Sequence, residues 1–152
     1  MQVKADSSLD DKKFIFGSIF LLSNRLQALG DQTLAEDDMT LRQWFLTVMI
    51  LQFDERQGPT LGDVARLMGT SHQNVKQMAL KLQQKEFLVF EKDESDGRVL
   101  RLKLTEKSKD YWKGKEAEQN QFLEKLYKNV SDEEVKMTVS LFKKLFQAVE
   151  EF

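Results

Sequence analysis

Polar side chains dominate the short segment between positions 71 and 81. The set comprises Ser71, His72, Gln73, Asn74, Lys76, Gln77 and Lys81. Glutamine and asparagine amides pair bidentately with adenine, whereas lysine suits guanine acceptors or phosphate. A serine hydroxyl and the free amides at the start of a helix also suit phosphate. The segment therefore carries the side chains of a base-contacting helix, with an ordinary solvated helix face as the alternative interpretation.

A second candidate for nucleic-acid contact is the acidic and basic pair Asp96 and Arg98. Arg98 suits a DNA minor groove, because the negative potential there attracts guanidinium. We expect Asp96 to accept a hydrogen bond from Arg98 and to hold its fork in place. The Asp-Gly-Arg sequence is also common as a plain turn with a local ion pair. Arg66, Arg101 and Lys103 are candidates for contacts with the DNA backbone, and plain surface charge is their equal alternative.

Two short capped helices are predicted to position the first group of side chains. Thr60, with Asp63 three residues later, resembles a capping box, and Gly69 follows where a left-handed C-cap belongs. Thr70 or Ser71 then caps the second helix. Apolar residues at helical spacing predict its buried stripe, which consists of Val75, Met78, Ala79 and Leu82.

Two strand-like runs, 87–92 and 99–104, follow these helices. In the second run leucines alternate with basic residues, and this period of two marks a half-buried strand. The Asp-Gly pair between the runs is a natural turn. Two capped helices followed by a hairpin predict a winged helix-turn-helix.

Helices are also predicted on both sides of this segment. The apolar residues of positions 9–29 cover a wide arc, which requires burial on more than one side. A partner subunit explains this arc, and a central core helix of the monomer is the alternative. We expect a polar connection from Gly30 to Asp38, and then a helix capped by Thr40 that ends near Arg56. Towards the end of the chain, a capping box begins at Ser131 and precedes a helix with an apolar seam.

Composition excludes several classes of protein. The chain has 152 residues, no cysteine and one histidine, which exclude disulfides and thiolate metal sites. We predict no metal and no cofactor. We expect a cytoplasmic protein without a signal peptide, because acidic residues precede the first apolar cluster and no apolar run approaches the ~20 residues of a membrane span. An enzyme has little support, since paired histidines and a glycine-rich phosphate loop are both absent from the sequence.

Charge is distributed unevenly along the chain, although its net value is only −2. Positions 60–105 carry eight basic and six acidic side chains, whereas the segments on both sides carry an acidic excess. From Ser71 to Lys85 there are three lysines and no acid. The basic excess therefore coincides with the predicted winged helix-turn-helix.

Together these features resemble the MarR family of bacterial transcription regulators over nearly the whole chain. The most specific match is Asp96-x-Arg98 followed by a leucine-rich strand and Leu104-Thr105. The resemblance implies a mainly α (α+β) fold and one MarR-type domain over residues 1–152. Residues 40–105 would form the winged helix-turn-helix DNA-binding lobe. Residues 1–39 and 106–152 would mainly supply dimerisation helices.

The resemblance also implies a function. Such a protein would be a sequence-specific regulator, more often a repressor, that binds a palindromic operator in double-stranded DNA as a homodimer. A small-molecule effector would bind near Trp44, Phe45 and Trp112, which are otherwise core residues. Cysteine-based oxidant sensing, found in some members, is excluded because this chain has no cysteine. The alternative is a winged-helix module that binds protein and not DNA.

Overall fold

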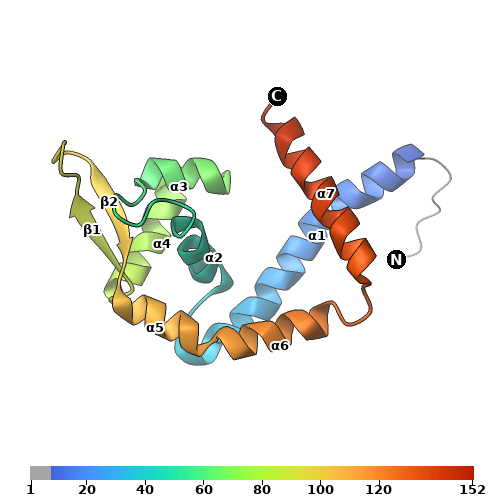
Figure 1. Ribbon diagram of the computed structural model, residues 1–152, viewed down its shortest axis with the longest axis horizontal. Helices are drawn as coiled ribbons and strands as arrows, with labels where there is room; N and C mark the ends of the chain where they lie inside the picture. The colour runs from blue at the N-terminus through green and yellow to red at the C-terminus, as the bar shows by residue number, and fades with distance from the viewer. Residues whose placement is uncertain (1–7) are drawn as a thin grey trace. The chain divides into compact units, whose positions relative to one another are not determined.

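The computed structural model of the protein describes residues 8–152. The first seven residues of the predicted N-terminal dimerisation segment lie outside this range. The elements are, in order, α1 (Ser8–Leu34), the 3-10 helix η1 (Ala35–Asp37), α2 (Leu41–Ile50), α3 (Leu61–Met68), α4 (His72–Gln84), β1 (Leu88–Lys92), β2 (Leu100–Leu104), α5 (Glu106–Gly114), α6 (Glu116–Leu126) and α7 (Asp132–Val149) (Figure 1). Helices with one small sheet confirm the predicted fold class.

The chain divides into two compact units, of which the first ends at Ser108 and the second runs from Lys109 to Phe152. In the first unit α2 is central, because it contacts α1, α3, α4 and β2. Leu46 of α2, Val64 of α3, and Val75 and Leu82 of α4 are completely buried. Burial of each such side chain contributes about 1.5–3 kcal/mol, so this core fixes how α3 and α4 lie against each other.

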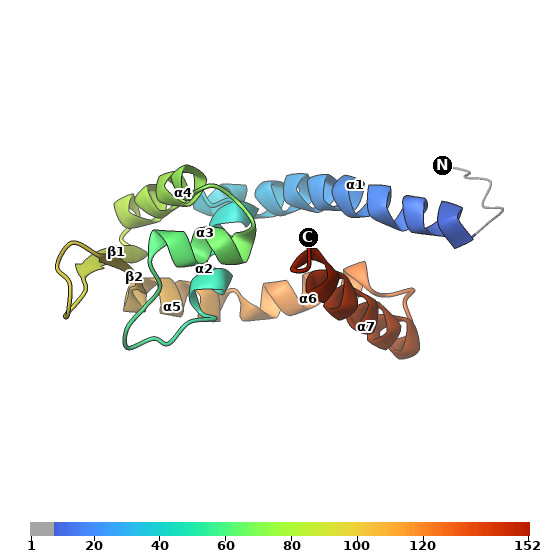
Figure 2. The ribbon, with the colours of Figure 1, turned by 90° about the horizontal axis from the view of Figure 1, so that it is seen from above.

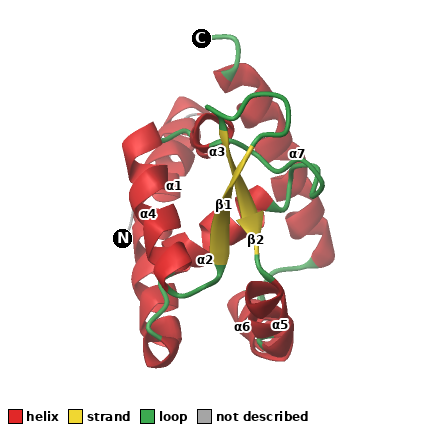
Figure 3. Ribbon diagram, turned by 90° about the vertical axis from the view of Figure 1, so that its left-hand side faces the viewer, coloured by secondary structure: helices red, strands yellow, loops and turns green. Residues whose placement is uncertain are grey.

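The strands β1 and β2 form a two-stranded antiparallel sheet beside α4 and α2 (Figure 3). Leu88 pairs with Leu104 and Lys92 pairs with Leu100, so both predicted strands are confirmed to within one residue at each end. The predicted alternation is confirmed at Leu102, which is buried, but Leu100 near the turn is exposed. The apolar face of the hairpin is therefore covered only at the end next to the helices.

The segment just before α3 runs along the outer edge of β2. The amide of Leu102 donates to the carbonyl of Pro59 at 2.8 Å, and Thr60 forms a bridge with Arg101. Gly58 has a φ of +72°, and a Cβ there would lie 2.6 Å from the Leu102 carbonyl oxygen. Only glycine fits this close approach. The hairpin is thus attached to the start of α3.

The predicted polar connection from Gly30 to Asp38 is wrong for its first half, because α1 continues to Leu34. Gly30 is buried in the helix, where a Cβ would meet the side chain of Leu41. Here glycine permits close packing of α1 against α2 and does not end the helix. The second helix was also predicted too long, since α2 ends at Ile50 and not near Arg56. Its predicted start is confirmed, because Thr40 forms a capping box with Gln43.

The apolar residues of α1 are largely exposed within the first unit. Figures 1 and 2 show α1 extending away from α2, α3 and α4 towards its N-terminal end. Only Gly30 of this helix is buried, so α1 is not a central core helix of its unit. The exposed large apolar side chains are Leu9, Phe14, Ile15, Phe16, Phe20, Leu21, Leu22 and Leu29.

The second unit also leaves an apolar seam exposed. Ser131 caps α7 and forms the predicted capping box with Glu134. No residue of α7 is buried, and Phe146 is 71% exposed. The other large apolar side chains exposed on this helix are Met137, Val139, Leu141, Phe142, Leu145 and Val149. None of the helices within residues 8–152 has the length and apolar content that crossing a membrane requires.

Candidate nucleic-acid interface

The helix α4 presents the predicted base-contacting side chains to solvent. Val75, Ala79 and Leu82 are completely buried, which confirms most of the predicted stripe, while Met78 is half-buried. Because these residues face the core, the other side of the helix faces outward. The residues on that outward side, together with the capping serine, are all exposed: Ser71, His72, Gln73, Asn74, Lys76, Gln77 and Lys81.

Local caps fix where α4 begins. Gly69 ends α3 with a φ of 63°, in the predicted left-handed conformation. Ser71 is the N-cap of α4, and its hydroxyl accepts a hydrogen bond from the Asn74 amide at 3.2 Å. The side-chain amide of Asn74 donates to the Thr70 hydroxyl at 3.1 Å. The start of the helix is thus ordered by bonds within the chain itself.

The turn between the strands is built around Asp93. One oxygen of its carboxylate accepts hydrogen bonds from the Ser95 hydroxyl at 2.6 Å and from the amides of Ser95 and Asp96, each at 3.1 Å. Hydrogen bonds from the Ser95 hydroxyl and the Arg101 guanidinium hold the pKa of Asp93 far below its ordinary value. Sequence analysis missed this residue, because a lone aspartate in a turn gives no signal of the number of bonds it accepts.

Asp96 holds the backbone of Arg98 and not its guanidinium. The Asp96 carboxylate accepts a hydrogen bond from the Arg98 amide at 3.0 Å, so the predicted bond to the guanidinium fork is wrong. Both side chains are exposed, and within residues 8–152 no carboxylate pairs with the Arg98 guanidinium. The arginine at the tip of the hairpin is therefore available to a partner.

The three basic residues expected to contact the DNA backbone differ in their surroundings. Arg66 is highly exposed on α3, with Asp63 at 4.0 Å. The Nζ of Lys103 donates to the carbonyl oxygens of Glu55, at 2.8 Å, and Arg56. Arg101 is only 18% exposed and has acceptors within the chain. Contact with DNA by these side chains stays a prediction, and only Arg66 has a largely uncommitted charge.

Arg101 lies at the turn end of the hairpin, where its guanidinium has two hydrogen-bond acceptors and one further carboxylate nearby. Its Nε donates to the Asp93 carboxylate at 2.8 Å, and Nη1 donates to the Gly58 carbonyl at 3.3 Å. The same Nη1 lies 3.9 Å from an Asp63 oxygen. Asp63 also accepts bonds from the Thr60 amide, at 2.9 Å, and hydroxyl, at 2.8 Å, which lower its pKa.

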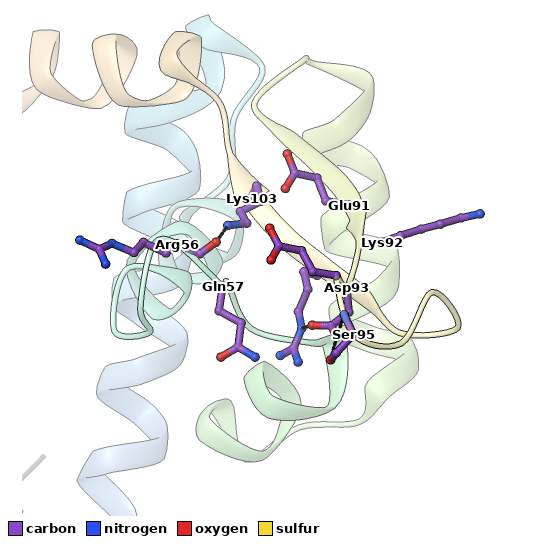
Figure 4. A pocket seen from close by; sticks show the side chains of 9 residues that line it. Arg56, Gln57, Glu91, Lys92, Asp93, Ser95 and Lys103 are labelled. Atoms are coloured by element: carbon purple, nitrogen blue, oxygen red, sulfur yellow. Dashed lines mark hydrogen bonds and ion pairs between the residues drawn. The ribbon is translucent and has the colours of Figure 1, made fainter.

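A polar pocket of about 500 Å³ opens between the turn end of the hairpin and the loop after α2 (Figure 4). It is lined by Arg56, Gln57, Glu91, Lys92, Asp93, Glu94, Ser95, Arg101 and Lys103. The residues predicted to line an effector site are not among them. Trp44 is half-buried and Phe45 is exposed on α2, while Trp112 is half-buried on α5 with no hydrogen-bond partner for its buried indole nitrogen in the described chain. An effector site there stays a prediction.

Within residues 8–152, no three histidine, aspartate or glutamate side chains are grouped so that they could hold a metal ion.

Comparison with solved structures identifies this arrangement of elements. A MarR family transcriptional regulator from Silicibacter pomeroyi superposes with a TM-score of 0.81 at 15% identity, covering 100% of both chains. A MarR protein from Peptoclostridium difficile gives a TM-score of 0.79 at 22% identity, covering 99% of this chain and 94% of the other. The chain has the MarR-type fold. The predicted resemblance is thereby confirmed at the level of the fold.

A further structure with the MarR-type fold is that of Staphylococcus aureus MepR in complex with DNA. It has a TM-score of 0.74 at 19% identity and covers 88% of this chain and 97% of the other. The sequence identities in these comparisons are low, so what this chain shares with these structures is the fold. No protein-family model and no curated protein matches the sequence.

Proposed function

We propose that this chain is a sequence-specific DNA-binding transcriptional regulator and not an enzyme. The observation that carries the proposal is the exposed polar surface of α4 beside a hairpin whose tip carries Arg98, an exposed arginine without an ion pair in the described chain. A chain of the same fold, S. aureus MepR, has been solved with DNA. In helix-turn-helix proteins the N-terminal residues of the second helix contact base edges in the major groove. The first turn of α4 supplies Gln73 and Asn74 for that role.

The proposed contacts divide between bases and phosphates. Gln73 and Gln77 offer both a donor and an acceptor to adenine, while Lys76 and Lys81 suit guanine or phosphate. Asn74 has one side-chain donor engaged with Thr70, so its carbonyl oxygen and second donor remain for DNA. His72 and the Ser71 cap lie at the helix start, where backbone phosphate is favoured. Arg98 would enter the adjacent minor groove.

We infer a homodimer from exposed apolar surface that occurs separately in both units. Phe14, Phe16 and Phe20 of α1 are each at least 46% exposed, and Phe146 of α7 is 71% exposed. Contiguous apolar surface of this kind marks interaction sites on soluble proteins. A two-fold dimer would place two α4 helices on half-sites about 10 bp apart or a multiple of that spacing. This geometry favours a palindromic operator.

Repression and response to an effector complete the proposal. A helix pair seated on a promoter blocks transcription by occupancy alone, which makes a repressor the simplest regulator of this type. A small molecule near Trp44, Phe45 and Trp112 would change DNA affinity only through its different affinity for two states of the dimer.

Selection of bound duplexes from a random DNA pool tests the central proposal. We expect a two-fold symmetric consensus, and affinity for it should fall steeply as salt rises, because phosphate contacts release counterions. Absence of enrichment would favour the alternative of a winged-helix module that binds protein. Sedimentation of the purified chain tests the dimer, which should have twice the 17.8 kDa mass of one chain.

A further inference from the structure

Arg101 joins three segments that are far apart in the sequence. Its guanidinium contacts the turn of the hairpin at Asp93, the loop at Gly58 and the first turn of α3 at Asp63. The side chains of Arg101 and Asp93 are only 18% and 9% exposed, so salt screens this ion pair less than a surface pair. Figure 4 shows Asp93 and Ser95 at the turn end of the hairpin on one side and Gln57 of the loop after α2 on the other, while Lys92 points away from this loop.

The bonds continue from Arg101 to the tip of the hairpin. The Asp93 oxygen that does not contact Arg101 accepts the amide of Asp96, and the Asp96 carboxylate accepts the amide of Arg98. An unbroken series of polar contacts therefore runs from Asp63 through Arg101 to the backbone of Arg98. Because Asp63 also caps α3, the series connects the tip to the helix-turn-helix itself.

We propose that Arg101 is a positioning residue, which fixes Arg98 relative to α4 through Asp93 and does not itself contact DNA. This inference rests on the proposed DNA-binding function. A guanidinium is suited to the role, because its planar fork donates in several fixed directions at once. A lysine ammonium keeps the charge but cannot reproduce that fork. The Nε and Nη1 atoms of Arg101 donate inside the protein, whereas Arg66 is highly exposed and has only Asp63 at 4.0 Å.

The test is a double-mutant cycle with an operator duplex that the wild type selects. Fluorescence anisotropy gives the Kd of the wild type, R101Q, R101K, R98A and R98A/R101Q, with R42Q as the matched control. Arg42 lies on α2, where its Nε donates to Gln27. We expect R101Q and R101K to weaken binding equally, by about tenfold, because both disrupt the support of Arg98. Substitutions that remove the same interaction do not add their effects, so R98A should cost about tenfold less on the R101Q background than in the wild type.

A direct phosphate contact predicts a different pattern. R101K would then keep most of the affinity, and the losses in R98A/R101Q would multiply, which would overturn the inference. Amide hydrogen exchange at Asp96 and Arg98 gives a second readout, and it should accelerate in R101Q while the melting temperature of the helices changes little. The inference would also be overturned if R101Q had unchanged amide hydrogen exchange at Asp96 and Arg98 and unchanged affinity for DNA.

The experiment also distinguishes a variant that fails to fold from a failure of the proposed function. If R101Q does not fold, D93N breaks the same ion pair with a side chain of equal size. D93N should show the same lack of additivity with R98A, and full additivity would overturn the inference. A wild type that selects no duplex overturns the proposed function, and with it the role of Arg101. If the wild type binds the selected duplex and R101Q binds it equally tightly, only the positioning role of Arg101 is overturned.

Discussion

A Cβ atom on Gly30 would lie 2.7 Å from Cδ1 of Leu41, which makes this glycine the contact point between α1 and α2. The carboxylate of Asp31 holds the same junction, because it accepts the amide of Leu41 at 2.7 Å. Leu41 is the first residue of α2. The direction in which α1 leaves α2 is therefore set by this close contact, by the hydrogen bond to Asp31 and by a second hydrogen bond, from the Nε of Arg42 on α2 to Gln27 on α1.

Gly30→Ala should destabilise the protein even though alanine favours helices. The added methyl group forces Leu41 to move, and overpacking of this kind costs about 1–3 kcal/mol, against a propensity gain of about 1 kcal/mol. Gly62→Ala is the control, because a Cβ there meets nothing closer than 3.7 Å. That variant should gain about 0.4–1 kcal/mol. Urea denaturation measures both, and equal stability of the two variants would contradict the packing role of Gly30.

Glu86→Gly should stabilise the protein. Glu86 follows the C-cap of α4 with a φ of 61°, a conformation that disfavours any residue with a Cβ. We expect the melting temperature to rise by about 1–4 °C. The exposed ion pair between Glu86 and Lys107 is lost in this variant, so Lys107→Gln serves as its control and should change little. A lower melting temperature for Glu86→Gly would show that the ion pair outweighs the backbone strain.

Local signals in the sequence predicted much of the segment from α3 to β2. The caps at Thr60, Gly69 and Ser71 depend on residues within three positions of each other, and each is confirmed. The hairpin was equally predictable, because alternation and an Asp-Gly turn are local patterns. Where neighbouring residues alone decide the conformation, the sequence is sufficient.

Contacts between distant segments could not be predicted in the same way. The sequence places Gly30 at the start of a polar connection, because nothing near it reveals the contact with Leu41. The partners of Arg101 lie 8 and 43 residues away, so this arginine could not be distinguished from a surface charge. The Asp96 bond was assigned to the wrong donor of Arg98, since backbone and guanidinium donors are both within its reach.

The stability of the folded protein should fall at low pH, partly because Asp63 becomes protonated. Bonds from the Thr60 amide and hydroxyl lower its pKa below the ordinary 3.8, so the folded state favours the charged form. This contribution is fully present above pH 3.8 and is lost as the pH falls towards the lower folded-state pKa. Asp63→Asn should therefore flatten the acid limb of the stability curve. Urea midpoints between pH 2 and 6 measure this, and parallel curves for wild type and variant would contradict it.

Ser71→Ala should reduce both stability and DNA affinity. The Asn74 amide loses its acceptor, and loss of an N-cap costs about 0.5–2 kcal/mol. Thr40→Ala is the matched control, because it removes the equivalent cap from α2, where Thr40 accepts the Gln43 amide at 3.2 Å. Both variants should melt earlier, but only Ser71→Ala should bind operator DNA more weakly. If Ser71→Ala and Thr40→Ala bound operator DNA with the same affinity, the start of α4 would not contact DNA.

Arg98→Ala should separate DNA binding from folding more cleanly than any other change. The side chain is exposed and makes no ion pair in the described part of the chain, so its removal should shift the melting temperature by less than about 1 °C. Loss of a base-contacting arginine costs about 1–3 kcal/mol, which corresponds to a roughly 5- to 150-fold higher Kd for the selected operator. Arg98→Lys keeps the charge and should recover only part of this loss, because the narrow groove favours the planar guanidinium. The slope of log Kd against log salt should fall by about one for Arg98→Ala and remain unchanged for Arg98→Lys. An unchanged Kd for Arg98→Ala at moderate salt would remove the hairpin tip from the DNA interface and leave α4 as its only element.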